Sequence, residues 1–155
     1  MNAGRAEQIG TPMDVYETPA TAYVGGFIGS PSMNFLPGRI ATDRRAAEVA
    51  GATLPLMASA AAGVEAGQAV SVGIRPEHLT PHGGAGAALA LTVEMAEPLG
   101  ADTLLHGRFA GADGLVTVRL PGHVRAAPGE KRTFAVESGQ LHLFDAATGR
   151  RIGAA

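Results

Sequence analysis

The chain has 155 residues, of which 46% are hydrophobic and 17% charged, and its formal net charge is -2. This length suits one domain, or one domain with a short appendage. The sequence contains no cysteine, which excludes disulfides, a thiol nucleophile and a thiolate metal site. No stretch approaches the roughly 20 apolar residues of a membrane-spanning helix, and the 22 Gly and 10 Pro favour short strands and turns over long helices.

Residues 1–29 differ from the rest of the chain in their predicted secondary structure. Residues 5–9 resemble a strand, and a short helix is predicted to follow, because Thr11 suits an N-cap and Pro12 the first helical position. Pro19 ends that helix. A second helix is predicted within residues 20–28, where the large apolar side chains fall on one face at helical spacing: Tyr23, Val24, Phe27 and Ile28.

From Pro31 onward, short strands separated by turns are predicted. Apolar and other side chains alternate in three stretches, 70–74, 89–95 and 116–120, and further strands are expected at 103–109, 134–136 and 141–144. Weak strands are expected near Val49 and Leu54, and residues 81–88 are expected to form a flexible loop. About seven short strands in roughly 120 residues predict a mainly β fold, a small barrel or sandwich, for which an oligonucleotide-binding (OB) barrel is one candidate.

Few of the residues that usually carry chemistry occur in a recognisable pattern. The five histidines are spread without metal-ligand spacing, and no serine stands in a nucleophile-elbow motif. The only lysine, Lys131, follows Glu130, whereas a phosphate-binding P-loop places glycine before its lysine. Basic residues are scattered and the β region has no Tyr or Trp, so nucleic-acid binding is not expected. None of these patterns supports an enzymatic function for the chain.

Two segments stand out. In residues 29–35, Pro31 follows a predicted helix end and forces an extended exit, while Ser30 and Asn34 can satisfy terminal backbone groups. A simple domain junction would account for this pattern equally well.

In the second segment, residues 73–79, Pro76 ends a strand. Arg75, Glu77 and His78 are then expected to project together from the turn. The plain alternative is a solvated turn with a local ion pair.

Four stretches, taken in order, resemble the C-terminal part of the maltose-transporter type of ATP-binding-cassette (ABC) ATPase subunit: 7–12, 15–20, 27–34 and 73–78. Residues 99–108, 140–145 and 148–151 are most similar to the members of that family that import sn-glycerol-3-phosphate. The resemblance covers nearly the whole chain.

The resemblance implies a mainly β, OB-like barrel of the TOBE type in residues 30–155. Residues 1–29, with one strand and two short helices, would be the last part of a nucleotide-binding domain. In the family, the motifs that bind ATP and Mg²⁺ and catalyse hydrolysis lie upstream of the stretch matched here. We therefore expect no catalytic residue, cofactor or metal in this chain, with ATP and Mg²⁺ belonging to the intact subunit.

The resemblance also implies partners and a location. Such subunits work as pairs whose C-terminal domains contact each other, so a homodimer is expected, together with permease subunits, a regulatory protein or a small-molecule inhibitor, and no nucleic acid. The expected location is cytoplasmic, on the inner face of the membrane. Seven residues are placed near the regulatory or dimer interface: Ser30, Pro31, Met33, Asn34, Arg75, Glu77 and His78.

Two further expectations accompany this assignment. The alternative function is a free-standing TOBE module that binds a small ligand or oxyanion through backbone donors beside arginines. If residues 11–29 normally pack on a further domain, their apolar face is expected to be partly exposed, with Tyr16, Tyr23, Phe27 and Ile28 on it.

Overall fold

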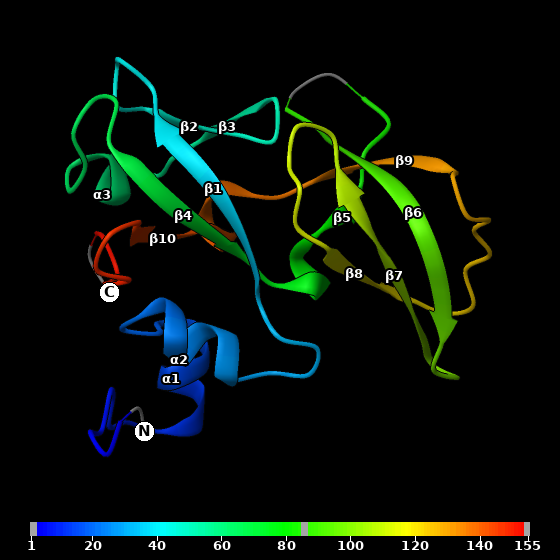
Figure 1. Ribbon diagram of the computed structural model, residues 1–155, viewed down its shortest axis with the longest axis horizontal. Helices are drawn as coiled ribbons and strands as arrows, with labels where there is room; N and C mark the ends of the chain where they lie inside the picture. The colour runs from blue at the N-terminus through cyan, green and yellow to red at the C-terminus, as the bar shows by residue number, and fades with distance from the viewer. Residues whose placement is uncertain (1–2, 85–86, 154–155) are drawn as a thin grey trace.

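The computed structural model describes residues 3–84 and 87–153. Its fold is mainly β, as predicted, with short helices at the N-terminus (Figure 1). In chain order the elements are α1 (Pro12–Glu17), α2 (Ala22–Phe27), β1 (Asn34–Ile40), β2 (Ala46–Val49), β3 (Ala52–Pro55), α3 (Ala58–Ala61), β4 (Ala69–Ile74), η1 (Pro76–His78), β5 (Thr80–Pro81), β6 (Leu89–Pro98), β7 (Asp102–Phe109), β8 (Val116–Pro121), β9 (Lys131–Ala135), η2 (Ser138–Gln140) and β10 (His142–Asp145).

The first helix begins where its capping signal predicts. The Thr11 hydroxyl accepts a bond from the Asp14 N–H, and the Asp14 carboxylate accepts one from the Thr11 N–H, which together form a capping box. The second helix begins after Thr21, whose hydroxyl accepts from the Val24 N–H. Both predicted helices are confirmed.

The strand predicted at residues 5–9 is wrong, because only Arg5 takes part in an isolated bridge there. A strand needs a continuous neighbour to satisfy its backbone groups. The Gln8 side chain links this stretch to the segment between α1 and α2 instead. Its amide donates to the Thr18 carbonyl and accepts from the Ala20 N–H.

The strands form two antiparallel sheets of five. One has the order β10-β4-β1-β2-β3, the other the order β5-β9-β6-β7-β8. Figure 1 shows the sheets beside each other, with α1 and α2 next to the first. The described residues thus form ten strands, more than the seven or so expected, and the weak strands near Val49 and Leu54 are confirmed as β2 and β3.

Strand β1 and helix α3 were not predicted from the sequence. The strand contains Pro37 and Gly38, two residues that ordinarily weaken a strand. Tertiary pairing forms it nevertheless, since β4 pairs along its length from Asn34 to Arg39. The loop expected at residues 81–88 includes two residues outside the described ranges; of the rest, Pro81 belongs to β5.

One apolar core joins the two sheets. Buried side chains of the first sheet, such as Leu36 and Val72, belong to the same cluster as Leu91 and Val118 of the second. The alternation of buried and less buried residues along β8 agrees with the period of two predicted for it. Within the described ranges, no helix has the length and apolar character needed to cross a membrane.

Candidate functional site

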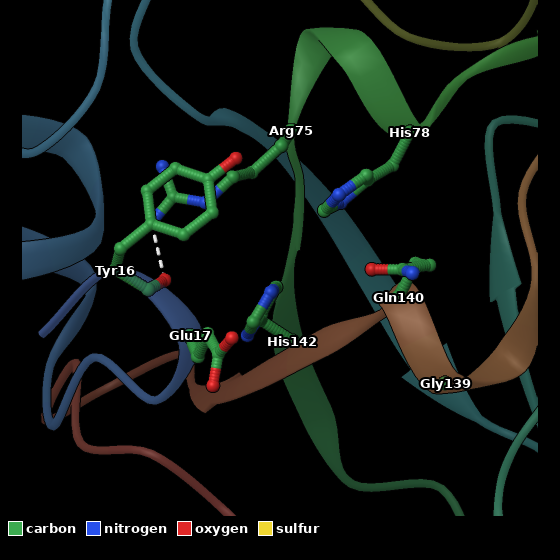
Figure 2. Close-up of a pocket in the computed structure, with 7 residues that line it drawn as sticks. All are labelled: Tyr16, Glu17, Arg75, His78, Gly139, Gln140 and His142. Carbon is green, nitrogen blue, oxygen red and sulfur yellow. Dashed lines mark hydrogen bonds between the residues drawn. The ribbon is translucent and has the colours of Figure 1, made fainter. Parts of the chain in front are cut away.

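A buried arginine joins the N-terminal helices to the first sheet. Arg75 directly follows β4 and is only 1% exposed. Its Nη1 donates to the Ile28 carbonyl at 2.8 Å and its Nη2 to the Tyr16 carbonyl at 2.6 Å. The guanidinium also lies over the Tyr16 ring, 3.7 Å from the ring centroid. Figure 2 shows Arg75 and Tyr16 stacked in this way.

The surroundings of Arg75 and Tyr16 determine whether each side chain is charged. Burial lowers the pKa of Arg75, but the two carbonyl oxygens and the ring face stabilise its charged form. Burial, followed by the hydrogen bond to Glu77, raises the pKa of Tyr16 to about 12. The Tyr16 hydroxyl therefore stays protonated at neutral pH and donates to a carboxylate oxygen of Glu77.

The predicted common projection of Arg75, Glu77 and His78 is therefore wrong. Arg75 points inward, Glu77 is exposed but engaged by Tyr16, and His78 is half-buried beside a cavity. The solvated turn with a local ion pair is also wrong. The physical reason is that the helices pack against the end of β4, where the guanidinium finds carbonyl acceptors instead of water.

The segment before β1 is held by the second sheet. Arg119 on β8 donates from Nη1 to the Ser30 carbonyl at 3.1 Å, and Asp102 fixes the same guanidinium through an ion pair of 2.6 Å. Ser30 is exposed and Pro31 is half-buried. Met33 is 4% exposed and fills the space beside Gly73, where any side chain would meet its sulfur.

Asn34 forms a direct bridge between the sheets. Its side chain is 7% exposed, donates from Nδ2 to the Thr117 carbonyl at 2.8 Å and accepts from the Thr117 N–H at 2.9 Å. The amide thus pairs with one residue of β8 as a backbone strand would. Of the seven predicted site residues, Met33, Asn34 and Arg75 are buried, whereas Ser30 and Glu77 are exposed.

A cavity of about 350 Å³ lies where α1, η1 and β10 meet (Figure 2). It is lined by Tyr16, Glu17, Arg75, His78, Gly139, Gln140 and His142. The side chains of His78, Gln140 and His142 extend into the same space, and Tyr16 closes it on the side of α1. The sequence did not predict Gly139, Gln140 and His142 as site residues, because residues 140–145 stood out only through their resemblance to the family and contain no binding motif.

His142 is buried, with 6% of its surface exposed, and accepts a 2.9 Å hydrogen bond at Nδ1 from Nη1 of Arg151. Burial, then the positive charges of Arg151 and Arg75, lower its pKa to about 4, with His78 contributing further. The ring is therefore neutral at pH 7. Because an arginine only donates, Nδ1 must be the acceptor, and the ring proton is on Nε2.

Within residues 3–84 and 87–153, no group of three or more histidine, aspartate or glutamate side chains could hold a metal ion. His106, for example, is held between Glu97 and Thr117, at 2.9 and 3.2 Å.

Comparisons with known proteins identify the fold. The family model described as "MalK OB fold domain" matches residues 29–79, and the model described as "TOBE domain" matches residues 72–144. Residues 29–144, called the OB–TOBE region below, therefore consist of a MalK-type OB fold and a TOBE domain. The predicted OB-like fold of the TOBE type is thereby confirmed.

Individual relatives match nearly the whole chain and confirm the predicted resemblance to the C-terminal part of ABC-importer ATP-binding subunits. The chain is 51% identical to the sn-glycerol-3-phosphate import ATP-binding protein UgpC of Burkholderia thailandensis, over 99% of the chain and 42% of the relative. The proteins of the same name from Paraburkholderia xenovorans and Ruegeria sp. are 48% and 43% identical, over 97% and 98% of the chain and 42% and 41% of the relatives. The chain thus spans about two-fifths of the length of these curated relatives.

Proposed function

We propose that the OB–TOBE region is the regulatory C-terminal part of an ABC-importer ATP-binding subunit serving the uptake of sn-glycerol-3-phosphate or a related sugar-type solute. The observation that carries the proposal is the 51% identity over 99% of the chain to a protein named for this import. On this proposal, ATP and Mg²⁺ bind elsewhere in the subunit, which lies on the cytoplasmic face of the membrane and contacts permease subunits. The OB–TOBE region itself catalyses nothing.

The geometry supports a mechanical role for the join at Arg75. Helices α1 and α2 carry exposed apolar side chains, with Met13 61% and Phe27 71% exposed, which a further domain would cover. If these helices move, the buried hydrogen bonds from Arg75 to the carbonyls of Tyr16 and Ile28 would transmit the movement to the first sheet. The region would transmit the opening and closing of nucleotide-binding domains, or an inhibitory signal in the reverse direction.

The proposal includes contact between two copies of the region. Ser30 and Glu77 are the exposed members of the predicted interface, with Pro31 and His78 half-buried beside them and Met33, Asn34 and Arg75 supporting them from within. Analytical ultracentrifugation of the 155-residue chain, from 1 µM to several hundred µM, is expected to show a reversible dimer. A well-folded chain that stays monomeric throughout would refute self-association.

A pair of matched variants locates the contact. Ser30→Glu brings two new carboxylates into the interface and is expected to weaken dimerisation at least about fivefold, because buried like charges are costly. Ser59→Glu makes the same change on the exposed α3 helix and is expected to leave the dimer intact. Equal effects of the two variants would contradict the placement of the interface.

A second candidate function is the binding of a small ligand or oxyanion by the region on its own. The observation that favours it is the cavity beside Arg75 and His142.

A further inference from the structure

The cavity has positive charge on both sides of His142. Arg75 lines it, and Arg151 lies behind the histidine, bonded to Nδ1. None of the four ion pairs formed by the described residues includes Arg75 or Arg151. Arg75 is stabilised by two carbonyl oxygens, the Tyr16 ring and the charge of Glu77, and Arg151 is half-buried, so both keep a positive charge that acts on His142. The surroundings of His142 therefore favour an anion.

Polar side-chain atoms that can donate hydrogen bonds face the same space without a partner in the described chain. The Nδ1 atom of His78 is buried and forms no hydrogen bond within the described chain. The proton on Nε2 of His142 faces away from Arg151, whose bond occupies the opposite side of the ring. Gln140 presents its side-chain amide from η2, and Figure 2 shows the three side chains converging. Buried donors left unpaired are costly, so a ligand that accepts from them gains affinity.

We propose that this cavity binds a tetrahedral oxyanion, either free inorganic phosphate or the phosphate group of a small monoester. His78, Gln140 and His142 donate to its oxygens, and Arg75 and Arg151 supply the field that attracts it. A volume of about 350 Å³ also admits a short carbon chain beyond the phosphate group. Tyr16 forms the wall against which that chain would lie.

Glu17 limits the affinity. Its exposed carboxylate lies at the cavity and repels an anion across water. We expect a dissociation constant of about 1 mM for the wild-type chain. Replacing Glu17 by Gln removes the repulsion and is expected to tighten binding by about threefold.

Isothermal titration of the 155-residue chain with inorganic phosphate, sulfate, glycerol-3-phosphate and glycerol tests the proposal. Heat with the anions and none with glycerol is expected, and tighter binding of glycerol-3-phosphate than of phosphate would identify the monoester as the ligand. No heat with any anion at 10 mM, or equal heat with glycerol, would overturn the proposal. Because the titration does not depend on dimerisation, its failure is separable from that of the proposed function.

Two variants show which cavity is responsible. Gln140→Glu adds a negative charge inside the cavity and is expected to reduce affinity at least tenfold. The matched control is Lys131→Gln, at a separate basic cavity lined also by His82 and Arg132, which is expected to leave binding unchanged. Circular dichroism and thermal melts establish that both variants fold. If Lys131→Gln abolishes binding and folded Gln140→Glu does not, the site is wrongly placed.

Discussion

Replacing Asn34 by aspartate tests the bridge between the two sheets with almost no change of shape. Asn34→Asp keeps the oxygen that accepts from the Thr117 N–H at 2.9 Å. It replaces the nitrogen that donates to the Thr117 carbonyl at 2.8 Å by a second oxygen. At neutral pH, a charged oxygen would then face a carbonyl oxygen at a position that is 7% exposed.

The folded protein can accommodate this change in two ways, and the less costly one sets the loss of stability. Keeping the charge loses a hydrogen bond and leaves a buried carbonyl unpaired, about 2 to 4 kcal/mol, and desolvates a carboxylate as well. Taking up a proton restores a donor to Thr117 but costs about 1.4 kcal/mol for each pH unit above the ordinary aspartate pKa of about 3.9. At pH 7 this second cost is about 4 kcal/mol, so we expect a loss of about 3 to 4 kcal/mol.

The sign of the pH dependence follows from the same argument. Burial and the facing carbonyl raise the folded-state pKa of the new carboxyl above its unfolded value. The loss of stability therefore grows as pH rises from about 3.9 towards the raised pKa, and at pH 5 it is expected to be only about 1.5 kcal/mol.

Urea unfolding of Asn34→Asp and wild type at pH 5 and pH 7 measures this difference. Asn34→Leu is the control, since it lacks both partners for Thr117 and its cost, about 2 to 4 kcal/mol, should not depend on pH. A loss below about 1 kcal/mol at pH 7 for Asn34→Asp, or equal losses at the two pH values, would refute the reasoning.

Two further predictions concern the site. Arg75→Met removes two charge-assisted hydrogen bonds, so amide hydrogen exchange in residues 11–29 is expected to accelerate about tenfold or more relative to the strands; unchanged exchange would show that the helices are held by other contacts. For His142, which faces Arg151, Arg75 and His78, the folded-state pKa of about 4 lies below the unfolded value, so stability is expected to fall as pH drops from about 6.5 to 4, by at most about 1.4 kcal/mol per pH unit. His142→Gln should remove this slope, and urea unfolding at pH 7, 5.5 and 4.5 would reveal a slope that persists.

The sequence predicts elements whose signals are local. The cap at Thr11 and the alternation along 116–120 are properties of neighbouring residues, and both are found in the structure. Strand β1 was missed because its Pro37 and Gly38 argue against a strand, while the pairing with β4 that forms it joins residues thirty to forty positions apart. The strand expected at residues 5–9 fails for the converse reason: among the described residues, this stretch pairs with no strand, and only Arg5 takes part in a bridge.

The site was predicted in part. Arg75 and Asn34 were singled out by their position near prolines, but their roles depend on partners 59 and 83 residues away, Tyr16 and Thr117. No periodicity connects such positions. His142 was grouped with the other scattered histidines, because its burial beside Arg151 exists only once β10 has paired with β4.

Tyr16 and Arg75 belong both to the attachment of the N-terminal helices and to the proposed anion site, so the two are expected to influence each other. Tyr16 and Arg75 both fasten the N-terminal helices and form one wall of the cavity. A ligand that binds only when this wall is in place stabilises the docked helices by RT ln(1 + [L]/Kd), about 1.4 kcal/mol at ten times its dissociation constant. By reciprocity, Arg75→Met weakens ligand binding to the extent that it undocks the helices. Occupancy of the cavity and attachment of the helices are therefore expected to be coupled, which would let a small anion bias the position of a neighbouring domain.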